Sequence, residues 1–223
     1  MLVKDRMTRN PITATPETTH KQASEMIKEH DVHHLPILDR RGKLVGMVTE
    51  NDLYDAQPSP ATTLSIYEIH GLLSRMQLKQ IMKHPVITVG TECELEEAAG
   101  LMLREDVSCL PVMDGDKLIG MITDSDIFRA FVELLGGEQD GGRFTFRCPD
   151  EPGQLAKVAQ AVANAGGNII AVTSWNHREK NDSFITIKEQ GANYEALMVE
   201  LEKTGTEVVD EREHSRSKPV KFE

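Results

Sequence analysis

Two short motifs hold the residues whose types and spacing suit chemistry, Thr49-x-x-Asp52 and Thr123-x-x-Asp126. Each follows an apolar segment and precedes a helix-like one, so each threonine is predicted to cap a helix, with the aspartate completing the cap. A helix N-terminus also attracts phosphate, and a carboxylate accepts hydrogen bonds from both hydroxyls of a ribose. Capping alone would account for both residue types, so the motifs predict two helix starts and leave nucleotide binding open.

A glycine, Gly46 or Gly120, precedes each motif inside an otherwise apolar strand. Glycine weakens a strand, and in that position it often marks the close approach of a ligand or of another backbone. The glycines therefore indicate that something lies against each strand just before the helix starts.

Both motifs belong to a longer internal repeat, because residues 3–56 and 78–132 align along their length. Their best-matched parts read HHLPILDRRGKLVGMVTENDL and SCLPVMDGDKLIGMITDSDI. Each copy reads as a short extended segment, a helix, two strands and a second helix, which is an α/β unit. A unit of roughly 55 residues buries too little apolar surface to be stable alone, so we expect the two copies to pack face to face.

A linker, residues 57–77, joins the copies and contains a predicted helix. Ser65 and Glu68 form a capping-box pattern at its start. An apolar stripe at helical spacing follows, made of Ile66, Ile69, Leu73 and Met76. The stripe indicates core packing or a dimer contact.

Composition excludes several classes of partner. The 25 Lys and Arg against 36 Asp and Glu give a net charge of −11, which repels nucleic acid and anionic lipid. No segment approaches the roughly 20 apolar residues of a membrane helix, so we expect a cytoplasmic protein without membrane or nucleic-acid partners. The three cysteines fit neither a disulfide framework nor a zinc site, which agrees with a reducing compartment.

Three clustered histidines, His30, His33 and His34, suggest a metal site at first sight. The second copy does not repeat them, and His33 and His34 should point to opposite faces of a strand. We therefore predict no metal site. No nucleophile or phosphate-loop motif occurs, so we predict no catalytic residue and no catalytic cofactor.

The C-terminal part has a different pattern, which begins after a glycine-rich linker at 137–142. Residues 143–212 read as strand, helix, strand, strand, helix, strand, the order of a ferredoxin-like α+β domain. A polar tail, 213–223, follows it.

The repeated patterns MT-x-x-P, LP[IV]-x-D and KL[VI]GM[VI]T-x-x-D resemble a tandem pair of CBS domains, with repeat 1 at 1–56 and repeat 2 at 78–136. The resemblance implies an adenosyl ligand such as AMP, ADP, ATP or S-adenosylmethionine in the cleft between the repeats. It implies that the threonines touch phosphate, the aspartates bind ribose and the extended segments contact adenine. The implied site residues are Ile12, Thr13, Thr49, Asp52, Val86, Ile87, Thr88, Thr123 and Asp126. Candidates for phosphate charge are Arg9, Arg40, Arg41 and His84.

The segment CPDEPGQLAKVAQAVANAGGNI resembles an ACT domain, a module that senses amino acids. The resemblance implies an effector cradle made of Asp150, Gly153, Gln154, Leu155 and Asn168. Alternatively, the turn only starts a helix, and the domain pairs with its copy through a sheet edge.

Two CBS repeats, a linker helix and one ACT domain together resemble the acetoin-utilisation protein B family. This resemblance implies a non-enzymatic, homodimeric regulator that assembles through its CBS and ACT domains and acts on an unidentified partner. Two alternatives stay open, a hydrolase or deacetylase of the same pathway and a scaffold that serves only dimerisation.

Overall fold

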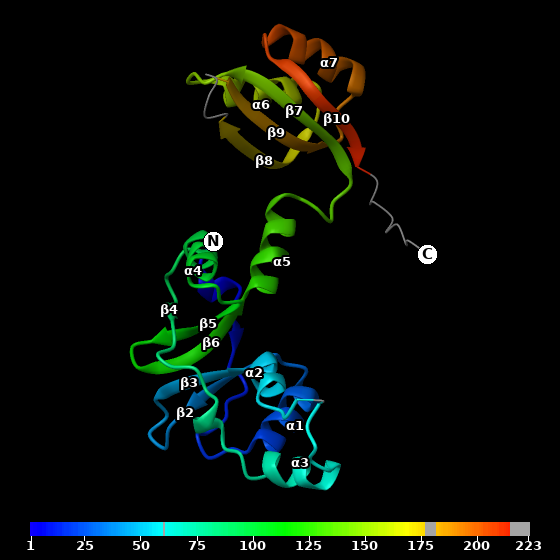
Figure 1. The fold of residues 1–223 in the computed structure, drawn as a ribbon. Helices are drawn as coiled ribbons and strands as arrows, with labels where there is room; N and C mark the ends of the chain where they lie inside the picture. The colour runs from blue at the N-terminus through cyan, green and yellow to red at the C-terminus, as the bar shows by residue number, and fades with distance from the viewer. Residues whose placement is uncertain (60, 177–181, 215–223) are drawn as a thin grey trace. The chain divides into compact units, whose positions relative to one another are not determined.

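The structure is a computed structural model that describes residues 1–59, 61–176 and 182–214. The chain divides into two compact units, Met1–Phe128 and Arg129–Glu223. The first unit contains nearly all of both repeats, and the second contains the ferredoxin-like domain (Figure 1). Within the described residues, no helix is both long and apolar enough to cross a membrane.

Repeat 1 consists of α1 (His20–His30), β2 (His34–Leu38), β3 (Leu44–Thr49) and α2 (Glu50–Asp55). A capping box formed by Thr19 and Gln22 starts α1, and Asp31 in the left-handed conformation ends it. β2 and β3 form an antiparallel hairpin. Apolar side chains from the helices and the hairpin pack into one core, which includes Leu35, Ile37 and Val48.

Repeat 2 has the same order, with α4 (Leu95–Glu105), β5 (Cys109–Asp114), β6 (Lys117–Thr123) and α5 (Asp124–Leu134). Asp106 ends α4 in the left-handed conformation, as Asp31 ends α1. The short extended segment predicted before each first helix is reduced to a bridge from Ala14 to Ile37 and to the two-residue strand β4 (Val89–Gly90). The predicted α/β repeat is therefore present twice.

The two repeats exchange their N-terminal segments. β1 (Thr8–Arg9), from the N-terminal segment of repeat 1, pairs with β6 of repeat 2. Lys83, from the N-terminal segment of repeat 2, pairs with Met47 on β3 of repeat 1. The 3₁₀ turns η1 (Val3–Asp5) and η2 (Leu78–Gln80) also bind the opposite repeat. The Val3 N–H donates to the Cys93 carbonyl oxygen at 2.9 Å, and the Leu78 N–H donates to the Thr18 carbonyl oxygen at 2.9 Å. Each repeat is thus completed by chain from outside its own βαββα segment.

This exchange explains the two strand glycines. A Cβ at Gly46 would lie 2.6 Å from Sδ of Met82, and a Cβ at Gly120 would lie 2.6 Å from Sδ of Met7. The Cβ at Gly120 would also lie 3.0 Å from the Thr8 carbonyl oxygen. The close neighbour of each glycine is therefore a methionine from the N-terminal segment of the other repeat. At Gly120, the Thr8 backbone oxygen is a second close neighbour.

Helix α3 (Ile66–Leu73) starts at the Ser65–Glu68 capping box, as the sequence predicts. It contains no buried residue, and Ile66 is 69% exposed. Core packing, one of the two interpretations of its apolar stripe, is therefore wrong for this helix.

The second unit contains β7 (Gly141–Pro149), α6 (Gln154–Asn164), β8 (Asn168–Asn176), β9 (Asp182–Gln190), α7 (Tyr194–Lys203) and β10 (Glu207–His214). The strands form one antiparallel sheet in the order β10-β7-β9-β8. The predicted ferredoxin-like fold is confirmed. β7 begins inside the predicted linker 137–142, and residues 215–223 of the predicted tail lie outside the described residues.

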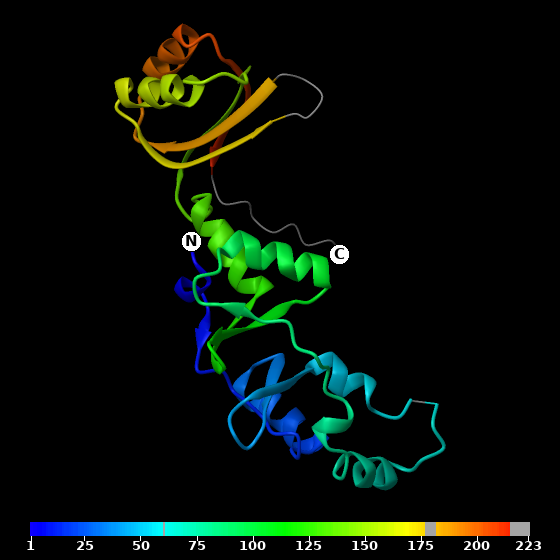
Figure 2. The ribbon, with the colours of Figure 1, turned by 90° about the vertical axis from the view of Figure 1, so that its left-hand side faces the viewer.

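Helices α6 and α7 cover one face of this sheet, as both ribbon views show (Figures 1 and 2). The core between helices and sheet includes Phe144, Phe146, Ile187, Leu197 and Leu201. Glycine in the left-handed conformation at Gly153 (φ 95°) and Gly166 (φ 79°) provides the sharp turns at the two ends of α6. The other face of the sheet carries Trp175 and Phe184, stacked with ring centroids 5.5 Å apart.

Candidate functional site

A cavity of about 310 Å³ lies between the two repeats. Repeat 1 contributes the ends of the β2–β3 hairpin and the start of α2. The segment before β4 and the turn between α4 and β5 supply the rest. This inter-repeat cavity is lined by His34, Met47, Thr49, Asn51, Lys83, Pro85, Val86, Ile87, Asp106, Val107, Ser108 and Cys109.

Thr49 lies on the cavity wall as the N-cap of α2. Its hydroxyl donates to Asp52 Oδ2 at 2.7 Å and accepts from the Asp52 N–H at 3.1 Å. The Thr49 N–H also donates to Asp52 Oδ2, at 2.8 Å. These bonds complete the predicted capping box, so the Thr49 hydroxyl proton is already used.

Asp52 has a second partner that the sequence did not indicate. Lys83 Nζ lies 2.7 Å from Asp52 Oδ1, and the Asp52 side chain is only 10% exposed. Burial opposes ionisation of Asp52, but Lys83 and Thr49 outweigh it, and the pKa of the carboxyl is lowered. The carboxylate is therefore ionised and held between a hydroxyl and an ammonium group.

Repeat 2 forms the same cap. The Thr123 hydroxyl donates to Asp126 Oδ2 at 2.8 Å, and the Thr123 N–H donates to the same oxygen at 3.0 Å. Neither residue lines the inter-repeat cavity. Burial, with the nearby Asp126 and Asp124 carboxylates, raises the pKa of the Cys109 thiol on the cavity wall, so this cysteine stays protonated.

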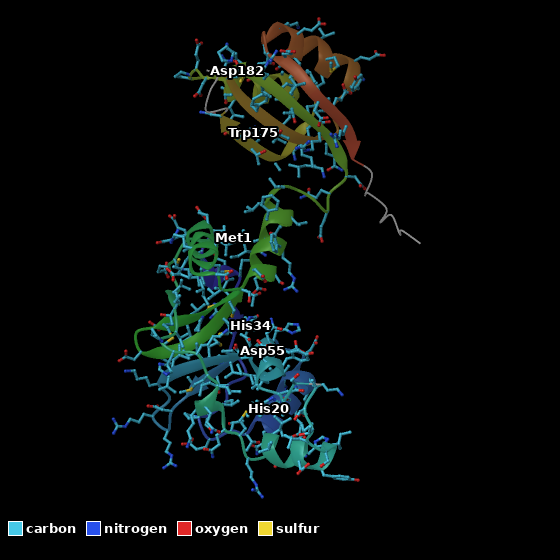
Figure 3. The ribbon with its side chains drawn as sticks, viewed as in Figure 1. Met1, His20, His34, Asp55, Trp175 and Asp182 are labelled. Atoms are coloured by element: carbon cyan, nitrogen blue, oxygen red, sulfur yellow. The ribbon has the colours of Figure 1, made fainter. Side chains whose placement is uncertain are left out.

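His34 connects the two repeats inside the cavity, and Figure 3 shows it between them. Its Nε2 lies 2.9 Å from the Ser108 hydroxyl oxygen of repeat 2. Burial, and then the neighbouring His33, lower the pKa of His34, against the opposing effect of Asp124 and Asp52. The imidazole is therefore neutral near pH 7.

The structure brings together only part of the predicted nucleotide site. Thr49, Val86 and Ile87 line the inter-repeat cavity. Ile12 instead packs against the core of repeat 1. The other predicted residues do not line this cavity: Thr13, Asp52, Thr88, Thr123 and Asp126.

None of the predicted phosphate-binding charges lines the cavity, whereas Lys83 does. Sequence reasoning missed Lys83 and Ser108, and it considered His34 only as a member of a possible metal site. The sequence offers one indication that Lys83 reaches this cavity. It follows Met82, in the N-terminal segment of repeat 2 that packs against repeat 1. His33 Nδ1 lies 2.8 Å from Glu50 Oε2. Among the described residues, no group of three or more His, Cys, Asp or Glu side chains could hold a metal ion.

Within this chain, the structure does not bring all residues of the predicted ACT effector cradle together. Asp150 accepts a hydrogen bond from Asn176 Nδ2 at 2.7 Å, at the C-terminal end of β8. Asn168 begins the same nine-residue strand, roughly 26 Å away at the usual rise of a strand. Gly153 caps α6, Gln154 is buried and Leu155 is 45% exposed. The turn therefore starts a helix, and its residues do not converge with Asn168.

Comparison with known families agrees with this architecture. The CBS domain family matches residues 3–59 and 78–133, which is more than half of the chain. The TTHA0829-like ACT domain matches residues 140–212. The chain belongs to the CBS domain family, as a tandem CBS pair followed by an ACT-like domain, and both predicted resemblances are confirmed. The individual domain boundaries stay predictions.

Individual relatives resemble mainly the CBS pair. A CBS domain-containing protein from Dictyostelium discoideum is 32% identical over 60% of this chain and 94% of its own length. The L-aspartate semialdehyde sulfurtransferase of Methanocaldococcus jannaschii is 31% identical, but the match covers 23% of that enzyme and 58% of this chain. This match therefore spans less than a quarter of the enzyme's length.

Two solved structures are similar in fold and sequence. A Vibrio cholerae protein assigned provisionally to acetoin utilization (AcuB) is 32% identical, with a TM-score of 0.51 over 63% of this chain and 98% of that one. The CBS domain pair of protein MJ0100, solved with 5′-methylthioadenosine and S-adenosyl-L-methionine, is 30% identical, with a TM-score of 0.50 over 62% of this chain and 98% of that one.

Proposed function

We propose that this protein is a non-enzymatic sensor of an adenosine nucleotide, which binds in the inter-repeat cavity. One observation carries the proposal, namely that both repeats wall a single 310 Å³ cavity containing a helix start at Thr49 and an extended apolar segment at Val86–Ile87. This volume lies at the lower end of the range for small-molecule sites. The similar MJ0100 pair binds adenosyl compounds.

In the proposed complex, adenine lies against Val86 and Ile87. The ribose hydroxyls approach Asp52, which is not on the cavity wall but pairs with the wall residue Lys83. The Lys83 ammonium must then leave Asp52 Oδ1, where it now lies at 2.7 Å. Its side chain is 73% exposed, so it is able to swing toward an anionic group on the ligand. AMP, ADP or ATP, which present phosphate, therefore fit this cavity better than the cationic S-adenosylmethionine.

An adenosine ligand acts as a regulator only if two states of the protein bind it with different affinity. His34 and Ser108 come from opposite repeats and meet across the cavity at 2.9 Å. A ligand that separates them would move one repeat against the other. We propose this displacement as the signal that reaches the unidentified partner protein.

A hydrolase is the second candidate function, because the same His34–Ser108 contact has the geometry of a base beside a nucleophile. Among the described residues, no acid forms a hydrogen bond with the other ring nitrogen of His34, which weakens this candidate. Ser108→Ala separates the two functions. A hydrolase loses turnover of acyl esters completely, whereas a sensor keeps saturable nucleotide binding.

We also propose a homodimer formed through repeat 2. An apolar groove of about 490 Å³ lies between α4 and α5, where Leu103 is 84% and Phe128 67% exposed. α4 carries Glu96 and Glu97 in its first turn and Arg104 in its last, so two antiparallel copies bring opposite charges together. Repeat 1 has exposed Lys28 where repeat 2 has Leu103, which favours contact between the two copies of repeat 2.

The edge strand β8, with Trp175 47% exposed (Figure 3), is the proposed contact between ACT-like domains. A role in acetoin utilisation, an amino-acid effector and a cytoplasmic location are further proposals. The first is supported by the similar Vibrio cholerae protein. A pure scaffold remains the third candidate, and it predicts dimerisation without any nucleotide binding.

Calorimetry of the full chain with AMP, ADP, ATP, S-adenosylmethionine, NAD and a panel of amino acids tests the sensor. We expect saturable binding of at least one adenine nucleotide. Asp52→Asn keeps much of the helix cap but loses the ribose acceptor and the Lys83 pair, so affinity should fall more than the melting temperature. If none of the adenosyl compounds binds, the sensor hypothesis is wrong.

A further inference from the structure

A separate pocket of about 340 Å³ lies within the second unit, at the end of the sheet beside the start of α7. Strands β7, β9 and β10 and helix α7 each contribute to it. Phe144, Ala192 and Leu197 form its apolar wall. Its polar side carries Glu189, Glu211 and Tyr194. None of these six residues belongs to the predicted ACT effector cradle.

Glu189 is the unusual member, because it is an acidic side chain that is only 6% exposed. Its Oε2 accepts a hydrogen bond from the Ala192 N–H at 3.0 Å. Among the described residues, no lysine or arginine forms an ion pair with it. A buried carboxylate is costly without a cation or several hydrogen bonds, so one backbone donor leaves it with unused capacity.

Two glycines make room for this carboxylate. A Cβ at Gly142 would come within 2.8 Å of Glu189 Oε1, and a Cβ at Gly167 within 2.9 Å of Oε2. Gly142 on β7 pairs with Glu189 on β9, so the carboxylate lies next to a strand residue that has no side chain. A side chain at either glycine would collide with the carboxylate in its present position.

Glu211 adds a second carboxylate to the pocket. It forms a hydrogen bond with Tyr194 that raises the pKa of the Tyr194 phenol. Arg212 also lines the pocket, but its Nε donates to the Asp210 carboxylate at 3.0 and 3.1 Å. The pocket is therefore anionic on its polar side and hydrocarbon on the other.

We propose that this pocket binds a small organic ammonium ion. The ammonium group lies against Glu189 and Glu211, and the hydrocarbon body lies against Phe144 and Leu197. The described part of the chain contains no group of three or more His, Cys, Asp or Glu side chains that could hold a metal ion, so we do not assign a metal to this pocket. A free amino acid fits poorly, because its own carboxylate would meet Glu189 and Glu211, while Arg212 is already paired with Asp210.

Calorimetry on the full chain tests this with isobutylammonium as the probe. Valine, which is the same amine with an added carboxylate, and isobutanol, which is uncharged, serve as matched controls. We expect saturable binding of isobutylammonium, and binding of valine and isobutanol weaker by about tenfold or more. No saturable isobutylammonium binding, or equal binding of the three compounds, would overturn the proposal.

Glu189→Gln removes the charge but keeps an oxygen for the Ala192 N–H, and we expect it to weaken isobutylammonium binding about tenfold. If this variant is unstable, Glu211→Gln on the outer strand decides in its place. Glu207→Gln is the control, because Glu207 lies on the same strand but pairs with Arg147. An equal loss with Glu207→Gln, or no loss with either pocket variant, would contradict the site.

Discussion

Lys83 and Asp52 form an ion pair in which the ammonium nitrogen lies 2.7 Å from the carboxylate oxygen, although the two residues belong to different repeats. Lys83 lies in the N-terminal segment of repeat 2, and Asp52 completes the capping box of the last helix of repeat 1. The pair exists because each repeat packs against the N-terminal segment of the other. It places a mobile positive charge beside the carboxylate that the proposed ligand needs.

The first prediction concerns Lys83→Met. This change removes the cation from the inter-repeat cavity, so we expect affinity for ATP and ADP to fall by about tenfold while affinity for adenosine changes little. Calorimetry with the three ligands measures the difference. Lys79→Met, an exposed neighbour outside the cavity, is the control. An equal loss for adenosine and ATP would show that Lys83 does not face phosphate.

The same pair predicts a pH dependence of stability. The folded-state pKa of Asp52 is lowered, so its stabilisation is present above the ordinary aspartate pKa and is lost as pH falls through the folded value. The Asp52→Asn variant should therefore be less stable than the wild type at pH 7 and equally stable in strong acid. Because the Lys83 side chain is exposed, we expect the difference in the free energy of unfolding at pH 7 to be less than about 1 kcal/mol. Urea unfolding at several pH values measures this. A constant difference across pH would contradict the assignment.

His34 predicts a second pH effect. Its pKa is lowered in the folded state, so unfolding takes up a proton as pH falls below the ordinary histidine pKa, and stability decreases there. His34→Gln keeps a polar group for Ser108 and cannot titrate. We expect the wild type to lose stability relative to this variant as the pH falls from about 7 to about 5. Thermal unfolding of the two proteins at several pH values measures this difference. Parallel curves for the two proteins would refute the shift.

The strand glycines predict a graded loss of stability. Gly120→Ala should cost about 1–3 kcal/mol, and more than Gly46→Ala. The reason is that the Thr8 backbone oxygen at 3.0 Å from the new Cβ cannot move away as readily as a methionine side chain. Gly90→Ala is the control, because nothing lies within 4 Å of its Cβ position. Chemical denaturation ranks the three, and the reverse order would argue against the exchange of Met7 and Met82.

The proposed dimer predicts that Leu103→Glu produces monomers. The substitution places a charge in the α4–α5 groove, so association should weaken strongly while the fold persists, because Leu103 is 84% exposed. Sedimentation velocity measures the assembly. Leu72→Glu on α3 is a matched control, since Leu72 is also an exposed leucine, at 50%. If Leu72→Glu dissociates the protein and Leu103→Glu does not, the interface lies on α3.

Local features of this chain were predictable from the sequence, and longer-range ones were not. The caps at Thr49 and Thr123 follow from residues three positions apart, since a capping box closes within one helical turn. Strand Gly46 indicated a close neighbour, but nothing local identified it as Met82. The resemblance to an ACT domain implied that Asp150 and Asn168 share a site, yet they lie at opposite ends of β8.

The sequence by itself determined the two repeats, the ferredoxin-like domain and the helix starts that carry Thr49 and Asp52. These depend on hydrophobic periodicity and on contacts between near neighbours in the chain. Only the tertiary structure decided that Lys83 pairs with Asp52, that His34 meets Ser108, and that Glu189 is buried between Gly142 and Gly167. Those contacts join residues far apart in the chain, and no local energy specifies such pairings until the segments have exchanged and packed.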